Sequence, residues 1–299
     1  MSNLPTLPHF LQSHVTDVVS VTVADHGAGQ TPDAWRERFP QCRPVLALAE
    51  RFGAKSLTRH DLFQLGAAAR QGVGTAAQEL VVATFIFGSR GVNSRGHAAK
   101  TLASPNVAKV TADVLKALES GNLVRLYQAF TSTPSIEGYG ESFFTKYLYF
   151  LTKGLSAECW PLDSRPLIYD ERVHRTLTFV NTMLGARWSP PSAPSARYDY
   201  YCRALGFWSE ELSALSASGG CEPDQIEYFL YVYAKEGVFA SPKYLRDLAC
   251  AALKSVSSGA IHPSLATAVA ALPEDFKASL VERTCEDSAA RGGRGDSGG

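Results

Sequence analysis

Lys146 and Asp170 are the two side chains of this 299-residue sequence whose types and surroundings could support a reaction. Lys146 lies in the run ESFFTKYLYFLTK, where Ser142, Tyr149 and Lys153 share its helical spacing among mainly apolar residues. A lysine on such a helix is partly removed from water, which lowers the pKa of its amine and makes the neutral, nucleophilic form more available. Asp170 follows the apolar run LIY and precedes a second amphipathic segment, so we expect it to cap a helix with its carboxylate.

Two glycines precede the helix that carries the lysine, in the sequence IEGYG of residues 136–140. This composition predicts a tight hairpin whose backbone either turns sharply or is approached closely by a ligand. Main-chain N–H groups at the start of a helix, together with the helix dipole, favour an anion such as a DNA phosphate. The residues expected to contact DNA here are Gly138, Tyr139, Gly140 and Ser142.

These features in this order resemble the helix-hairpin-helix DNA glycosylases. The runs GYGESFFTKYLYF and PLIYDERV are similar to bacterial proteins with an 8-oxoguanine DNA glycosylase fold. The resemblance implies an all-helical fold and excision of an oxidised base such as 8-oxoguanine from double-stranded DNA, with AP lyase activity as an additional option. It also implies Lys146 as the nucleophile and Asp170 as its acid/base partner. In the better-known lysine-using branches the nucleophile directly follows the hairpin. That position is Ser142 here, Phe144 stands where a small residue is usual, and Lys146 lies one turn further along the same helix face.

Each of these residues also has an ordinary structural explanation. Most lysines on helices face solvent, and most aspartates before a helix only cap it. A second hypothesis is therefore a protein that keeps the glycosylase fold without its chemistry and acts as a DNA-binding or protein-interaction module. A helical scaffold with no role on nucleic acid is a third. The displaced lysine and the net charge of zero favour the second hypothesis over the first.

Charge and composition limit the remaining classes of function. With 29 basic and 29 acidic residues, DNA affinity must come from local patches rather than from a global field. The most basic segment spans residues 90–125 and begins in the glycine-rich run GSRGVNSRG, expected to be a loop, where Arg90 and Arg95 suit phosphate contacts. Solvated helix faces explain the same charges equally well.

Nothing in the sequence indicates a cofactor or a metal. The six cysteines include no CxxC pair, so neither a zinc site nor an iron–sulfur cluster is predicted. We find no signal-peptide pattern and no apolar run of membrane-spanning length, and we therefore expect a cytoplasmic, monomeric protein without a membrane segment.

Helical periodicity predicts a mainly α fold with at most a minor β element near the N-terminus, where residues 15–23 are rich in β-branched side chains. Helices are expected over residues 44–52, 57–71, 78–87, 197–204 and 225–235. The expected domains are an N-terminal mixed segment (1–50), a helical glycosylase-like core (51–236) with the hairpin region at 136–150, C-terminal helices packed on the core (237–285) and a disordered tail (286–299).

Overall fold

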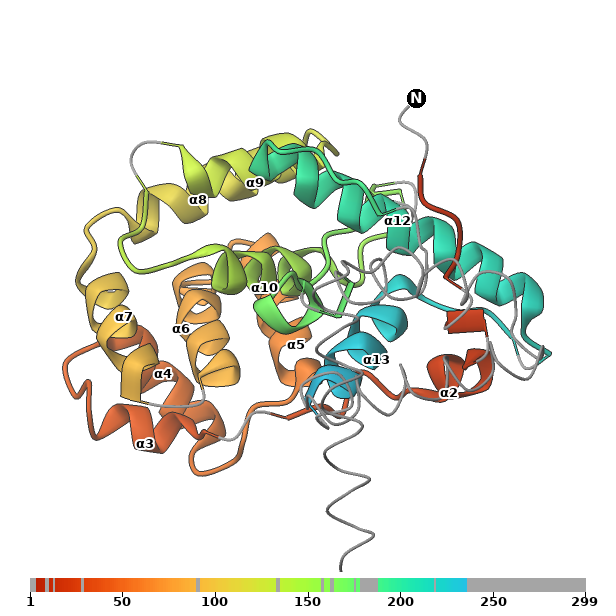
Figure 1. Ribbon diagram of the computed structural model, residues 1–299. Helices are drawn as coiled ribbons and strands as arrows, with labels where there is room; N and C mark the ends of the chain where they lie inside the picture. Colours follow the sequence, from red (N-terminus) through yellow and green to blue (C-terminus); the bar gives the residue numbers. More distant parts are fainter. Residues whose placement is uncertain are drawn as a thin grey trace, which may run out of the picture. The chain divides into compact units, whose positions relative to one another are not determined.

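The computed structural model describes residues 4–8, 11–12, 14–27, 30–89, 92–132, 135–156, 159–161, 164–174, 176–177, 188–217 and 219–235. These residues form a mainly helical fold, which confirms the predicted class (Figure 1). The helices with defined bounds are α2 (Val15–Ser20), α3 (Pro32–Arg36), α4 (Arg43–Phe52), α5 (Arg59–Arg70), α6 (Ala76–Gly88), α7 (Val92–Ala103), α8 (Val107–Leu118), α9 (Leu123–Thr131), α10 (Glu141–Thr152), α12 (Pro194–Leu215) and α13 (Pro223–Lys235). Arg90, the helices expected over 237–285 and the tail over 286–299 lie outside the described residues.

The chain divides into two compact units. The first comprises Met1–Leu4, Val15–Glu171 and Ser189–Phe229, and the second comprises Pro5–His14, Arg172–Trp188 and Leu230–Gly299. Lys146, Asp170 and the glycine hairpin all belong to the first unit. The site can therefore be described within that unit alone.

Inside the second unit, the Arg172 guanidinium donates a hydrogen bond to the Tyr231 hydroxyl (3.2 Å) and lies 5.4 Å from the centre of its ring. The Thr176 hydroxyl donates to the carbonyl oxygen of Leu230 (3.3 Å). These contacts join the chain after Asp170 to the C-terminal half of α13.

Two local expectations differ from the structure. Residues 15–20 form the helix α2 instead of a strand, with Val18 buried, because burial outweighs the weak β preference of its branched side chains. The described residues contain an isolated bridge between Gly27 and Thr58 but no strand. The expected loop over residues 88–96 is interrupted, since α7 already begins at Val92.

The early start of α7 has a packing explanation. Ala98 and Thr101 on this helix are fully buried, and tertiary packing of such a face outweighs the low helix propensity of a single glycine, here Gly96.

Helices α5, α6 and α10 pack against one another at the centre of the first unit (Figure 1). The closest approach is at Gly66 of α5, where an added Cβ atom would lie 2.0 Å from the carbonyl oxygen of Phe150 in α10. Only glycine allows two backbones to come this close. As a result α10 is enclosed, and every residue from Phe144 to Thr152 is buried.

Hydrogen bonds fix both ends of the pair formed by α5 and α10. Thr58 and Asp61 form a capping box at the start of α5, in which the Asp61 carboxylate accepts from the Thr58 backbone N–H (2.9 Å) and the Thr58 hydroxyl accepts from the Asp61 N–H (3.3 Å). At the other end, the Arg70 guanidinium donates to the carbonyl oxygens of Leu151 and Lys153, where α10 stops. None of the described helices combines the length and hydropathy that spanning a membrane requires.

Candidate active site

The amine of Lys146 lies in the enclosed part of α10, and the residue is 6% exposed. Its Nζ donates to the backbone oxygen (2.8 Å) and to the hydroxyl (3.1 Å) of Ser142, one turn earlier. Burial lowers the pKa of the amine, and the carboxylate of Asp170 opposes this shift without cancelling it. The predicted removal of this lysine from water is therefore confirmed.

Asp170 is positioned by hydrogen bonds to the backbone just before it. The Tyr198 hydroxyl of α12 accepts from the N–H of Leu167 (3.1 Å) and donates to its carbonyl oxygen (2.7 Å). The Thr145 hydroxyl of α10 accepts from the N–H of Tyr169 (3.2 Å). Because Thr145 is the neighbour of the lysine in sequence, these bonds bring the aspartate to the same part of α10.

The structure brings Lys146 and Asp170 together. Nζ lies 3.7 Å from Oδ2, and the two side chains are 7% and 14% exposed. Asp170 directly precedes the helical residues 171–174, the location expected for a capping residue. A separation of 3.7 Å allows the carboxylate to stabilise the ammonium, and a small adjustment or one bridging water allows it to accept the proton.

A second buried ion pair was not predicted from the sequence. Arg59 at the start of α5 donates to both carboxylate oxygens of Glu227 in α13 (2.8 and 3.3 Å), with exposures of 1% and 0%. The guanidinium lies over the rings of both Tyr149 and Tyr228, 5.2 and 5.1 Å from their centres. The partners are 168 positions apart. A charged residue on a predicted helix is also typical of a solvated helix face, so the sequence carries no signal that pairs these two.

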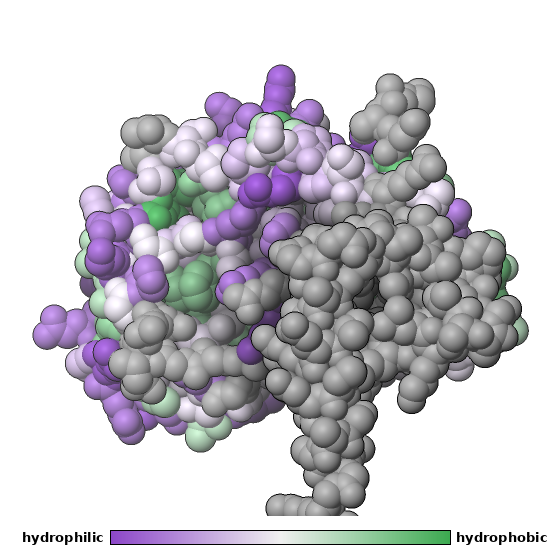
Figure 2. Space-filling model, in the orientation of Figure 1, coloured by the Kyte–Doolittle hydropathy of each residue, from purple (hydrophilic) through white to green (hydrophobic). Residues whose placement is uncertain are grey.

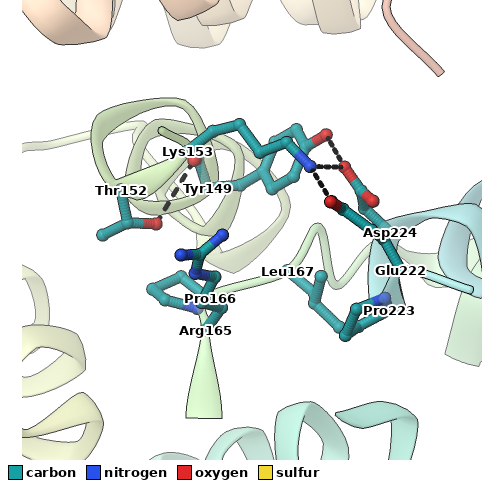
Figure 3. A pocket seen from close by; sticks show the side chains of 9 residues that line it. All are labelled: Tyr149, Thr152, Lys153, Arg165, Pro166, Leu167, Glu222, Pro223 and Asp224. Atoms are coloured by element: carbon teal, nitrogen blue, oxygen red, sulfur yellow. Dashed lines mark hydrogen bonds and ion pairs between the residues drawn. The ribbon is translucent and has the colours of Figure 1, made fainter. Parts of the chain in front are cut away.

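The far end of α10 carries a second lysine in a different environment. Figure 3 shows Lys153 reaching Asp224 (2.7 Å) and Glu222 (2.5 Å), while the Tyr149 hydroxyl donates to Asp224 (2.7 Å). Burial lowers the pKa of the Lys153 amine, but the two carboxylates outweigh it and the net shift is upward. Lys153 therefore remains an ammonium, and Lys146 is the lysine of this helix suited to nucleophilic attack.

The glycine hairpin forms where it was expected, and its two glycines have different roles. Gly138 has φ +78°, and a Cβ atom there would lie 2.6 Å from the carbonyl oxygen of His97 in α7. At Gly140, the N-cap of α10, nothing lies within 4 Å of an added Cβ atom. The side chain of Tyr139 is buried, with its hydroxyl 2.7 Å from that of Thr84, so only its main chain is available to a ligand.

A hollow of about 660 Å³ opens beside the hairpin. Figure 2 shows recessed apolar surface among polar side chains on the face where Figure 1 places α6, α7 and α10. Ser142 lines the hollow and also accepts the hydrogen bond from Lys146, so it connects the hairpin to the buried amine. Glu137 and Glu141 line it too, and each has a cation nearby: Lys100 for the first (3.1 Å) and Arg197 for the second (3.6 Å).

Two arginines, Arg90 and Arg95, were also predicted to contact DNA. Arg95 belongs to the first turn of α7. Arg90 is outside the described residues. Among the residues whose side chains are described, no group of histidine, cysteine and carboxylate side chains is arranged to hold a metal ion.

A family model described as "Putative 8-oxoguanine DNA glycosylase OGG-like protein" matches residues 21–231, more than half of the chain, including Lys146, Asp170, Arg59 and Glu227. No curated protein and no solved structure matches the chain.

Proposed function

Since the chain belongs to the family of 8-oxoguanine DNA glycosylase OGG-like proteins, we propose that it excises an oxidised base such as 8-oxoguanine from double-stranded DNA. The observation that carries the proposal is the buried Lys146 amine 3.7 Å from the Asp170 carboxylate. A neutral amine beside a proton acceptor is the pair that nucleophilic attack on a sugar carbon requires.

In the proposed reaction the damaged nucleotide first leaves the base stack, at a cost of a few kcal/mol, because C1′ cannot be reached inside a duplex. The Lys146 amine then forms a bond to C1′ as the bond from C1′ to the base breaks. The base departs with the electron pair and takes a proton from solvent. Asp170 stabilises the positive charge that develops on the sugar and accepts the proton released by the attacking nitrogen.

The covalent intermediate allows strand cleavage as a second step. When the C1′–O4′ bond opens and O4′ is protonated, an iminium (Schiff base) remains between Lys146 and C1′. Loss of a C2′ proton then expels the 3′ phosphate, and water hydrolyses the Schiff base to restore the free lysine.

DNA would be held by the hairpin. Main-chain N–H groups at Gly140 and in the first turn of α10 are suited to a backbone phosphate, and the space beside Gly140 lets a phosphate approach. Because these contacts replace bound counterions, affinity should fall as salt is added.

The test is borohydride trapping on duplexes that carry 8-oxoguanine, other damaged bases or none. Borohydride reduces the iminium to a stable amine, so the enzyme should become covalently attached to one class of damaged duplex. Lys146→Ala should abolish the adduct, whereas Lys116→Ala, at an exposed site on α8, should leave it unchanged. An adduct that persists in Lys146→Ala would remove this mechanism.

The alternative function is a DNA-binding or protein-interaction module without chemistry. Ser142 at the position directly after the hairpin and the net charge of zero favour it. Binding to duplex DNA without an adduct on any damaged base would support this alternative.

A further inference from the structure

The ion pair of Arg59 and Glu227 lies against the same helix as the candidate nucleophile. Arg59 donates to the Tyr149 hydroxyl (3.3 Å), and Tyr149 is three residues from Lys146 on α10, close to one helical turn. Glu227 is fixed to Arg59 by two hydrogen bonds. Two ion pairs of the first unit, the partly buried pair of Lys146 and Asp170 and the fully buried pair of Arg59 and Glu227, therefore involve the same helix about one turn apart.

Three helices and one connecting segment supply these charged groups. Lys146 comes from α10, Arg59 from α5 and Glu227 from α13, while Asp170 comes from the segment that α10 and α12 hold by hydrogen bonds. Because these groups are largely removed from solvent, each charge acts on the others more strongly than it would in water. The protonation of any one group then depends on the charge of its neighbours.

We propose that Glu227, fixed in place by Arg59, is a second electrostatic partner of the Lys146 amine, after Asp170, and helps to set the pH range in which that amine is neutral. Glu227 is a positioning residue under this proposal, since it acts through the lysine. The inference rests on the proposed function in assigning Lys146 as the nucleophile.

The direction of the effect follows from the charges. Burial of the Lys146 amine lowers its pKa, and the carboxylates of Asp170 and Glu227 raise it, with Arg59 opposing them. Burial raises the pKa of Glu227 to about 7, against the lowering influence of Arg59. Above pH 7 Glu227 is therefore mainly ionised and stabilises the ammonium form of the lysine.

Other polar groups also face this cluster, and none of them is substituted in the variants of the test. They are Ser142 and Tyr149 on α10, Asp170 before the helical residues 171–174, Tyr201 on α12 and Asp224 on α13.

The competing explanation is that Arg59 and Glu227 only join α5 to α13. A structural ion pair predicts lower stability in any variant that breaks it, but no specific change in the titration of the lysine. A titration of the amine itself, measured without DNA, separates the two explanations.

The experiment follows the ¹³Cε resonance of Lys146 against pH in protein labelled at lysine, with the signal assigned from Lys146→Arg. Glu227→Gln keeps the shape of the side chain and removes its charge, and it should move the midpoint of the titration down by about 1 pH unit. Glu227→Asp keeps the charge and shortens the side chain, and its midpoint should stay close to that of the wild type. Asp61→Asn is the matched control, because it breaks the capping box of α5 without removing a charge of the cluster.

Unchanged midpoints in both Glu227 variants would overturn the proposal, as would equal shifts in Glu227→Gln and Asp61→Asn. If circular dichroism shows that Glu227→Gln is unfolded, the double variant Arg59→Met/Glu227→Leu replaces the pair by apolar side chains of similar size, a change that folded proteins often tolerate. Its midpoint should also move down, by less, because Glu227 influences the lysine more than Arg59 does.

The same variants distinguish this inference from the proposed function. In borohydride trapping, the rising limb of the pH–rate profile of Glu227→Gln should move down together with the titration. A shifted titration in a protein that forms no adduct would support the electrostatic role and reject Lys146 as the nucleophile of the proposed function. Normal trapping with an unshifted titration would support Lys146 as the nucleophile and reject the electrostatic role of Glu227.

Discussion

Lys146 and Asp170 show how the surroundings of a residue decide its chemistry. Lys146 on α10 and Lys153, the residue that follows this helix, lie about two helical turns apart, yet burial lowers the pKa of the first and carboxylates raise that of the second. In the proposed reaction, the carboxylate beside the Lys146 amine accepts the proton that the attacking nitrogen releases.

Asp170→Asn should separate binding from chemistry. The amide keeps the size of the side chain but cannot accept the lysine proton or stabilise positive charge on the sugar, so single-turnover excision should slow by roughly a hundredfold or more. Affinity for duplex DNA, measured by fluorescence anisotropy, should change little. Asp113→Asn is the control because it removes the same charge from an exposed site on α8. Equal excision rates in the two variants would show that Asp170 is only a cap.

Gly88, the last residue of α6, should matter for the position of the amine. A Cβ atom there would lie 3.2 Å from Cε1 of Phe143, closer than these atoms normally approach, and 3.4 Å from Cε of Lys146, which leaves the lysine no spare room. Gly88→Ala should therefore shift Phe143 and the neighbouring lysine and reduce the trapping rate by roughly tenfold, since small misplacements of reacting groups are costly. Gly96→Ala on α7 meets nothing within 4 Å and should trap normally. Wild-type trapping by Gly88→Ala would mean that this contact does not set the position of the amine.

At the scale of elements, a substitution in the glycine hairpin tests whether its main chain contacts DNA. Gly140 has open space around it, so Gly140→Leu should fold while its side chain blocks the approach of a phosphate. Affinity for duplex DNA should fall by about tenfold, the effect of losing a charge-assisted hydrogen bond, and its dependence on salt should become shallower. Gly140→Ser, with a small side chain favourable at an N-cap, should bind nearly as well as the wild type. Full affinity in a folded Gly140→Leu protein would exclude the hairpin as a phosphate site.

The elements also show what the sequence can and cannot predict. Helices α4, α5, α6 and α13 follow apolar periodicity within a few residues, because each buries one face or is buried entirely. The start of α7 was missed, since buried Ala98 and Thr101 outweigh a glycine-rich run that locally resembles a loop. The approach of Asp170 to Lys146 was predicted through a resemblance. The pair of Arg59 and Glu227 was not, because its partners are joined only by the tertiary fold.

At the scale of the whole molecule, Glu227 should make stability depend on pH. Its folded pKa of about 7 lies above the ordinary value of 4.5, so the folded state holds a proton that the unfolded state has already released between these values. The contribution of this group to the free energy of unfolding is therefore fully present below pH 4.5 and is lost as the pH rises to about 7.

Thermal unfolding of wild type and Glu227→Gln across this range should test that dependence. The difference in melting temperature in favour of the wild type should shrink as the pH rises, because only the wild type loses this contribution. Glu222→Gln, at a side chain that is 56% exposed, is the matched control for the loss of a carboxylate. A difference that stays constant with pH would mean that Glu227 does not titrate in this window.

Gly66 can influence the charged groups although it does not contact them. It lies seven residues after Arg59 on α5, about 10 Å along the axis, and its contact on α10 is Phe150, one turn after Lys146. A methyl group at Gly66 would force the two backbones apart and tilt α5, which carries the arginine, away from α10, which carries the lysine. The spacing of the four charges is thus adjustable by a neutral residue, and the reactivity of the amine can change while every ionisable side chain of the protein stays the same.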